Sequence, residues 1–330
     1  NDTPTVSTTI ADASTDEDAA YSYDASANFT DVDTGDTATY TVSNNPTWMS
    51  IDSATGILSG TPDNDDVATT NITVTRTDTA GESASDTFAL TVDNTNDAAV
   101  ISGTSTGAVT EDDSTMTTTG TLTHTDVDAN NADNTFTAVS TGTASANGYG
   151  TYTVTAGGAW TYTLDNTNST VTALAVSATA TDSFAVTAED GTSQTITVTI
   201  TGANDTPTVS TTIADASTDE DAAYSYDASA NFTDVDTGDT ATYTVSNNPT
   251  WMSIDSATGI LSGTPDNDDV ATTNITVTRT DTAGESASDT FALTVANTND
   301  TPTVSTTIAD ASTDEDAAYS YDASANFTDV

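Results

Sequence analysis

The sequence predicts an all-β protein built as a tandem array of β-sandwich domains, and two observations carry this prediction. Long stretches alternate polar and apolar residues, as in TATYTVS (37–43) and TNITVTRTD (70–78), and a period of two is typical of half-buried strands. A stretch of about 100 residues also recurs along the chain, a length that suits one sandwich better than a short solenoid repeat. No segment shows the sustained apolar period of a helix.

The recurrence divides the chain into four parts. Residues 1–97 recur at 204–300 with one difference, Asp93 against Ala296. The first 32 residues recur once more at the end of the chain. The expected domains are a first copy (1–95), a middle segment of different sequence (96–203), a second copy (204–298) and a partial copy (299–330). Because the chain starts and stops at internal phases of the repeat, we expect it to be a piece of a longer array.

Within each part, alternating runs bounded by turn residues mark the expected strands. In the first copy they are residues 19–25, 37–43, 56–61, 71–77 and 86–92. In the middle segment, two hairpins are expected, at 150–165 and 183–200. Their turns are Gly157-Gly158 and Asp190-Gly191.

The charge balance excludes several classes of function. The chain has 51 acidic residues against 2 basic ones, both arginine, and a formal charge of −49. Binding of nucleic acids or of anionic membrane surfaces needs many more cationic side chains. The sequence contains no cysteine, no lysine for an isopeptide cross-link, and no apolar run long enough to span a bilayer. Self-repulsion of this size disfavours a compact state, so bound cations are expected.

Acidic phrases recur at fixed phases of the copy: DED (16–18), DVDTGD (31–36), DNDD (63–66), Asp78 and DNTND (93–97). Successive loops of a sandwich alternate between its two ends. The first, third and last phrases are therefore expected to meet at the exit end, and the other two at the entry end. Copies stacked end to end would then form one oxygen-rich pocket at each junction. Six to eight hard oxygen ligands are what Ca²⁺ prefers.

Other interpretations of the same residues were weighed. A single Asp-Asn-Gly phrase is typical of an ordinary turn, and only the convergence of several phrases favours calcium. DVDTGD is not an EF-hand loop, since Val42 stands at the position of the bidentate glutamate. The tryptophans at 48, 160 and 251 are expected in the cores, with carbohydrate stacking as the alternative. Each arginine is expected to pair with a nearby carboxylate, and His124 either supports the entry site of the middle segment or ends a strand.

The ordered motifs of the copy resemble a cadherin-type repeat. They are DVD, SIDSATGILSGT, DNDD, TDTAG and the linker VDNTND, and the resemblance is nearest to the bacterial dystroglycan-type cadherin-like module of giant adhesins. The linker departs from the cadherin pattern because Asn94 and Asn297 replace its first aspartate, and DNDD lacks the arginine of the cadherin loop.

The middle segment resembles a VCBS-type repeat of large bacterial surface proteins. The phrases that carry this resemblance are VTEDDS (109–114), THTDVDANNAD (123–133), GYGTYTVTAGGAWTYTLDN (148–166), AEDG (188–191) and ITVTITGANDTP (196–207). The two resemblances together imply Ig-like or cadherin-like sandwiches joined by short Ca²⁺-binding linkers.

The resemblances also imply a ligand set for Ca²⁺ at three junctions. At the first, the ligands are Glu17, Asp63, Asp65, Asn94, Asn96, Asp97, Asp126, Asp128 and Asp190. At the second, they are Glu111, Asn204, Asp205, Asp234, Asp236 and Asp281, with Asp165 as a further candidate. At the third, they are Glu220, Asp266, Asp268, Asn297, Asn299, Asp300 and Asp329. Asp31, Asp33 and Asp78 form the entry set of the first copy.

The function expected is mechanical rather than catalytic. With one histidine, no cysteine and no lysine, the chain offers little for an enzyme, and its carboxylates recur in every unit. We expect a Ca²⁺-stabilised stalk of a large secreted bacterial surface protein, whose partners are calcium ions and neighbouring repeats. The alternatives are a subunit of a self-assembling filament, sheath or surface layer, which would bind other copies of itself, and a module that binds extracellular glycans.

Overall fold

The computed structural model describes residues 1–128 and 134–329, and this part of the chain is all-β. The only helices within it are 3-10 turns of three residues, η1 to η5. None of its helices has the length and apolar character needed to span a membrane. The last five residues of the motif THTDVDANNAD lie outside the described residues.

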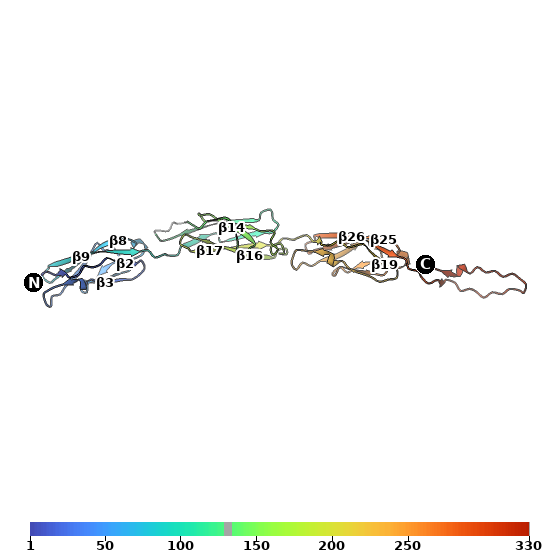
Figure 1. Ribbon diagram of the computed structural model, residues 1–330, viewed down its shortest axis with the longest axis horizontal. Helices are drawn as coiled ribbons and strands as arrows, with labels where there is room; N and C mark the ends of the chain where they lie inside the picture. The colour runs from blue at the N-terminus through green and yellow to red at the C-terminus, as the bar shows by residue number, and fades with distance from the viewer. Residues whose placement is uncertain (129–133, 330) are drawn as a thin grey trace. The chain divides into compact units, whose positions relative to one another are not determined.

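The first copy contains two main sheets. The four-stranded sheet has the order β2 (Ala13–Asp16), β9 (Ser83–Asp93), β8 (Thr69–Thr77) and β5 (Thr39–Ser43). The three-stranded sheet has the order β3 (Tyr21–Asp24), β7 (Ile57–Gly60) and β6 (Ser50–Ile51), and β1 (Thr5–Val6) pairs with β4 (Phe29–Thr30). Two 3-10 turns interrupt the strands, η1 (Ser26–Asn28) and η2 (Asn64–Asp66). Strands β8 and β9 are antiparallel neighbours (Figure 1).

The second copy repeats this topology. Its four-stranded sheet is β19 (Ala216–Asp219), β26 (Ser286–Ala296), β25 (Thr272–Thr280) and β22 (Thr242–Ser246). Its three-stranded sheet is β20 (Tyr224–Asp227), β24 (Ile260–Gly263) and β23 (Ser253–Ile254), and β18 (Thr208–Val209) pairs with β21 (Phe232–Thr233). Its 3-10 turns are η3 (Ser229–Asn231) and η4 (Asn267–Asp269). The partial copy holds β27 (Thr303–Val304), η5 (Ser324–Asn326) and β28 (Phe327–Thr328).

The middle segment has a five-stranded and a three-stranded sheet. The first has the order β10 (Val100–Gly103), β12 (Thr117–Thr125), β15 (Ala159–Leu164), β14 (Gly150–Val154) and β13 (Val139–Ala144). The second has the order β11 (Thr106–Thr110), β17 (Ser193–Thr201) and β16 (Thr179–Thr187). Both expected hairpins are confirmed, β14–β15 and β16–β17, and Gly158 and Gly191 have positive φ at their turns.

All five strands expected in the first copy are confirmed, but four short ones were not foreseen: β1, β2, β4 and β6. These have two to four residues, too few to show an alternation. Strand β2 pairs in parallel with β9, nearly 80 residues away, so only tertiary structure defines it. Its last residue, Asp16, lies opposite Asp93, so the strand brings the next residue, Glu17, to the start of the linker.

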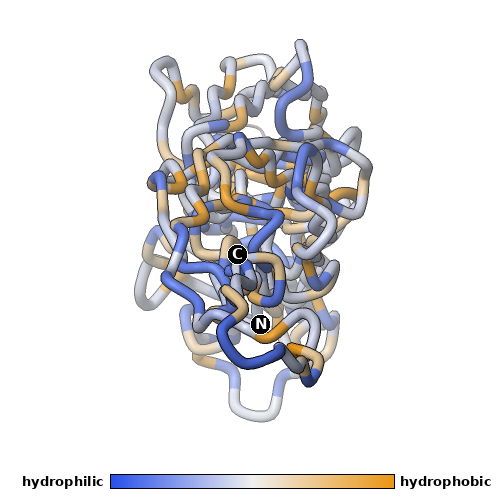
Figure 2. The backbone as a smooth tube through the Cα atoms, turned by 90° about the vertical axis from the view of Figure 1, so that its right-hand side faces the viewer, coloured by the Kyte–Doolittle hydropathy of each residue, from blue (hydrophilic) through white to orange (hydrophobic). Residues whose placement is uncertain are grey.

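The alternation of the strands builds the core. Along β8 and β9, Ile72, Val74, Phe88 and Leu90 point inward and are at most 2% exposed, while Thr and Ser occupy the other face. Figure 2 shows the same pattern as short hydrophobic and hydrophilic segments that alternate along the tube. Leu58, on the facing sheet, is fully buried in this cluster.

By compactness, the chain divides into two units, which are described separately below. One comprises residues 1–107, 117–163 and 182–198, and the other residues 108–116, 164–181 and 199–330. Each linker between repeats lies within one of these units: residues 94–97 in the first, and residues 203–205 and 297–300 in the second.

The buried leucine of each copy tests this packing. Replacing Leu58 and its equivalent Leu261 by alanine leaves a cavity, so the free energy of unfolding of each copy should fall by about 2–5 kcal/mol. Both are changed together, because Trp48 and Trp251 then report one transition in urea. The control changes the neighbours Ile57 and Ile260, which are 36–37% exposed and should cost less than half as much. Equal losses in the two variants would contradict the assignment of the core.

Candidate metal sites at the linkers

The exit end of the first copy is built around Glu17. It follows β2, and its backbone N–H donates to the carbonyl of Asp93, 3.0 Å away, so the parallel pairing of β2 and β9 places it beside the linker. Its side chain is 2% exposed, and Oε1 accepts a 2.7 Å hydrogen bond from the backbone N–H of Thr95. Its second oxygen, Oε2, is buried without a hydrogen-bond partner among the described residues.

Two further carboxylates approach Glu17 from the linker and from the middle segment. Asp128 accepts from the backbone N–H of Asp97 (2.9 Å) and from Nδ2 of Asn94 (3.2 Å). Glu17, Asp97 and Asp128 each offer one carboxylate oxygen, and these oxygens lie within 4.8 Å of one another. Each such pair repels by on the order of 3 kcal/mol at an effective dielectric constant near 20. A bound cation would therefore stabilise the cluster. Neither arginine of the chain supplies it, because they pair with Asp31 and Asp234.

The DNDD loop reaches the linker through its asparagine. Asn64 donates from Nδ2 to Oδ2 of Asp97 at 2.7 Å. Asp63 and Asp65, the two predicted ligands, are exposed, and Asp63 accepts from the backbone N–H of Asp65 in the cap of η2. Together with Asn64 and Val127, they line a polar hollow beside the linker.

The entry end of the middle segment holds the linker through backbone groups. The N–H of Ala99 donates to Oδ2 of Asp190 at 2.9 Å, and the N–H of Asp128 donates to Oδ1 of Asp126 at 3.0 Å. The other linker asparagine, Asn96, is turned to the carbonyl of Asp97, 3.0 Å away. Of the predicted residues outside the linker, Glu17, Asp128 and Asp190 accept hydrogen bonds from backbone N–H groups of residues 95–99, whereas the bonds of Asp63 and Asp65 lie within their own loop.

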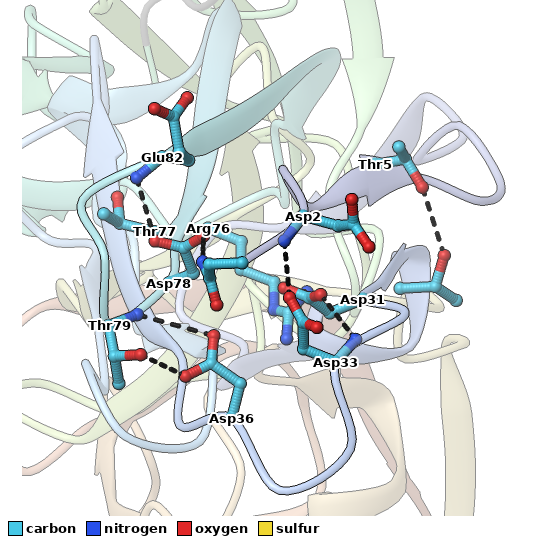
Figure 3. A network of polar contacts seen from close by, with 12 residues as sticks. Asp2, Thr5, Asp31, Asp33, Asp36, Arg76, Thr77, Asp78, Thr79 and Glu82 are labelled. Atoms are coloured by element: carbon cyan, nitrogen blue, oxygen red, sulfur yellow. Dashed lines mark hydrogen bonds and ion pairs between the residues drawn. The ribbon is translucent and has the colours of Figure 1, made fainter.

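Figure 3 shows the corresponding entry end of the first copy, where the aspartates converge as predicted. Nδ2 of Asn1 donates to Asp78, and the backbone N–H of Asp2 donates to Asp33. Asp31, Asp36 and Asp78 each place a carboxylate oxygen within 4.8 Å of the others.

The second linker repeats this arrangement with the second copy. Asn204 donates from Nδ2 to Asp281 (2.9 Å), and the backbone N–H of Asp205 donates to Asp236 (2.9 Å). Oδ1 of Asp236 and Oδ2 of Asp205 are buried, and neither has a hydrogen-bond partner among the described residues. Asp234 contacts this cluster through its bond from the N–H of Asp236 (3.2 Å).

Glu111 occupies the position of Glu17 at the second linker. It is 1% exposed, Oε1 accepts from the backbone N–H of Ala203 (3.0 Å), and Oε2 is buried with no partner among the described residues. Burial raises the pKa of Glu111 to about 7, with the charges of Asp205 and nearby aspartates adding to the shift. Burial and neighbouring aspartates also raise the pKa of Asp205 and of Asp236. The cluster resists ionisation when no cation is bound.

At the third linker, the structure shows the exit half of the site. Glu220 accepts from the N–H of Thr298 (2.7 Å) and from Nδ2 of Asn297 (3.0 Å), and Asn267 donates to Asp300. Asp266 and Asp268 repeat the cap of η4, as their equivalents do in η2, and Asn299 bonds to the carbonyl of Asp300. Asp329, the predicted ligand from the partial copy, is exposed.

The structure adds several residues to these clusters that are not among the predicted ligands. They are Asn64, Asn267, Asp36, Asp239, Asp112 and Asn166. Asp112 exchanges two hydrogen bonds with Asn166, whereas the candidate Asp165 is exposed and bonds only locally to Thr167. Each of these residues stands inside a predicted acidic phrase or next to a candidate, so the sequence indicated the right region. A phrase by itself does not indicate which of its side chains turns inward.

The remaining side chains singled out in the sequence have structural roles. Trp160 is 1% exposed and donates to the carbonyl of Thr104, and Trp48 packs edge-on against Tyr21 with ring centroids 6.2 Å apart. The expectation of core tryptophans is confirmed. His124 is 1% exposed, packs against Phe136 and bonds to the backbone of Thr135. Both arginines pair with a carboxylate, as expected.

The donor set fits a hard divalent cation. Every predicted ligand at the three linkers offers a side-chain oxygen, and several of those oxygens are buried and unpartnered in the described part of the chain: those of Glu17, Glu111, Glu220, Asp205 and Asp236. A buried carboxylate oxygen without a donor is costly, and coordination of a cation would remove that cost. Carboxylate, amide and carbonyl oxygens are the ligands of Ca²⁺.

The two copies and the middle segment match two different protein families. Residues 3–93 and 206–296 match the family described as "Putative Ig domain". The chain belongs to this Ig-domain family. Residues 96–202 match the family described as "Bacterial cadherin-like domain". The family-level prediction of Ig-like and cadherin-like repeats is thus confirmed. Among curated proteins, none matches the chain.

Solved structures with the same fold are cadherin ectodomains. Mouse cadherin-23 EC22-24 is 18% identical with a TM-score of 0.52, and the match covers 90% of this chain and 100% of that one. Protocadherin gamma B2 domains 3–6 are 13% identical with a TM-score of 0.51, covering 91% and 75%. The protocadherin gammaB7 EC3-6 cis-dimer structure is 16% identical with a TM-score of 0.50, covering 92% and 76%. The match establishes an all-β, tandem Ig-like and cadherin-like fold.

The raised pKa of Glu111 predicts a pH dependence in the absence of divalent cations. An ordinary glutamate ionises near pH 4.5, and Glu111 ionises near 7 in the folded chain. Ionisation of Glu111 therefore destabilises the folded state. In EDTA, the contribution of Glu111 to the free energy of unfolding should be fully present below pH 4.5 and should fall by on the order of 1–3 kcal/mol as the pH rises through 7. Urea unfolding at pH 5 and pH 8 measures this loss.

The variant Glu111→Gln, which cannot ionise, should show a smaller loss. Glu315→Gln, at an exposed position of the partial copy, is the matched control and should behave like the natural chain. A pH dependence unchanged in Glu111→Gln would contradict the assignment.

Proposed function

We propose that the chain is a Ca²⁺-stabilised structural stalk of a large secreted bacterial surface protein, of the adhesin type. The observation that carries this proposal is the set of buried, unpartnered carboxylate oxygens at successive linkers, in a chain with only two cationic side chains. The family matches and the cadherin fold support it, since both describe repeated structural modules. Assignment of the copies to the dystroglycan type and of the middle segment to the VCBS type is part of this proposal.

The residues that would hold Ca²⁺ at the first linker are Glu17, Asp97 and Asp128, with Asn94, Asn96, Asp126 and Asp190 around them. Bound calcium would supply positive charge there. The chain itself fixes the carboxylates beforehand: backbone N–H groups of the linker hold one oxygen of Glu17, Asp128 and Asp190. The linker thus stays ordered only when these carboxylates can lie close together. Extracellular modules use sites with Kd values of roughly 10⁻⁴–10⁻³ M.

This arrangement supports a mechanical role for the chain. A linker whose amides are bonded to carboxylates of the repeats on both sides is restrained in rotation. Loss of the cation would restore the repulsion between the carboxylates and make the linker more flexible. The proposed role is therefore to hold another part of the protein at a distance from the cell, with calcium setting the stiffness of the array.

Removal of calcium tests this proposal. In millimolar Ca²⁺, small-angle scattering should give a long, stiff particle, and EDTA should shorten it and increase its flexibility. The triple variant Glu17→Gln, Glu111→Gln and Glu220→Gln should need at least about tenfold more Ca²⁺ for the same effect, because each glutamine removes one buried anionic ligand.

The matched control changes the neighbouring exposed aspartates, Asp16→Asn and Asp219→Asn, and should bind calcium as the natural chain does. If scattering curves in Ca²⁺ and EDTA superimpose, the stalk proposal in this form is wrong.

The glycan-binding alternative gains no support, since no tryptophan or tyrosine of the middle segment is among the exposed large apolar residues of the described part.

A further inference from the structure

The only two cationic side chains of the protein stand at equivalent positions beside two of the candidate sites. Arg76 and Arg279 are 8% and 7% exposed. Their Nη1 atoms lie 3.4 Å and 2.8 Å from Oδ2 of Asp31 and Asp234. Figure 3 shows Arg76 among the aspartates at the entry end of the first copy.

Strand alternation explains why each arginine points into its cluster. In β8, the inward positions are Ile72, Val74 and Arg76, and all three are buried. Two residues later comes Asp78, which is 6% exposed and on the same side of the sheet. The guanidinium therefore closes the end of the core and faces the carboxylates of the DVDTGD loop. A buried guanidinium needs an anionic partner, and a buried aspartate needs a cationic one, so the pair satisfies both groups.

The middle segment has no arginine at this position. In the β16–β17 turn, Ala188 and Gly191 make the backbone hydrogen bonds that Asp78 and Gly81 make in the first copy, so Val186, which is 1% exposed, stands at the position of Arg76. The nearest cationic candidate is His124, whose Nε2 is engaged with the backbone of Thr135. Asp126, Asp128 and Asp190 therefore face the first linker without the fixed guanidinium that Asp234, Asp236 and Asp281 have at the second.

We propose that Arg76 and Arg279 are built-in cations that replace part of the calcium requirement at the entry ends of the copies. The two linkers then differ in their dependence on calcium. The first linker, held by Asp128, is ordered only when cations are bound, whereas the second, held by Asp236, keeps its order at lower calcium because Arg279 already compensates one carboxylate. This inference rests on the proposed function, since it assumes that the clusters bind Ca²⁺.

Hydrogen exchange measured by mass spectrometry can follow the two linkers separately, because their sequences, NTNDAAV and GANDTPT, differ. The reporter amides are those of Asp97, bonded to Asp128, and of Asp205, bonded to Asp236. As free Ca²⁺ is lowered in the full chain, the first linker should lose protection at a concentration about tenfold higher than the second. A charge-assisted hydrogen bond has a strength that corresponds to roughly that factor.

The decisive variant is Arg279→Gln. It should shift the midpoint of the second linker about tenfold towards higher Ca²⁺, and Arg279→Lys, which keeps the charge, should restore most of the difference. Arg76→Gln makes the identical change in the first copy, whose entry end faces Asn1 and Asp2, and should leave both linkers unchanged.

The outcomes separate the two proposals. If neither linker of the natural chain responds to Ca²⁺, the proposed calcium function fails. If both respond but Arg279→Gln shifts neither midpoint, the calcium function stands and the inference about arginine is wrong. If Arg279→Gln fails to fold even in saturating Ca²⁺, the arginine is a core element that calcium does not replace, which also overturns the inference.

Discussion

Mutual repulsion of carboxylates held close together is the constraint on which the rest of the structure depends. The chain carries 51 acidic residues and 2 basic ones, and its fold gathers carboxylates to within 4.8 Å at the first linker and at the entry end of the first copy. The two arginines form ion pairs with one carboxylate each, Asp31 and Asp234, which leaves most of this charge uncompensated by the protein. Concentrating like charges in buried positions destabilises a fold, and the proposed binding of cations from solution would link order at the linkers to the ionic composition of the medium.

The sandwich topology produces this concentration from ordinary strand pairing. Parallel pairing of β2 with β9 brings Glu17 beside the linker, although nearly 80 residues separate the two in sequence. Backbone N–H groups of the linker then bind one oxygen of Glu17 and one of Asp128, while the second oxygen of Glu17 is buried without a hydrogen-bond partner among the described residues. The same hydrogen bonds therefore order the linker backbone and leave ligand oxygens available to a cation.

Near-identity of the two copies makes the middle segment informative by contrast. It keeps the positions of Glu17, Asp31 and Asp33 as Glu111, Asp126 and Asp128, and it places an aspartate, Asp190, in the same turn as Asp78 but two residues further along. What it does not keep is the arginine beside the entry cluster. Alternation of the two kinds of repeat thus places two kinds of linker in one chain, with the same carboxylate framework and different fixed charge.

The sequence by itself determined the all-β class, the long strands, both hairpins and the phases of the acidic phrases, because these depend on local alternation, turn residues and simple repetition. Only the tertiary structure decided which oxygen of each phrase turns inward. It chose Asn64 over Asp63 and Asp65 for the contact with Asp97, added Asp36 to the entry cluster, and defined β2. The physical reason is that a loop of consecutive polar residues has no periodic signal, so the direction of each side chain is fixed by hydrogen bonds to residues far away in sequence.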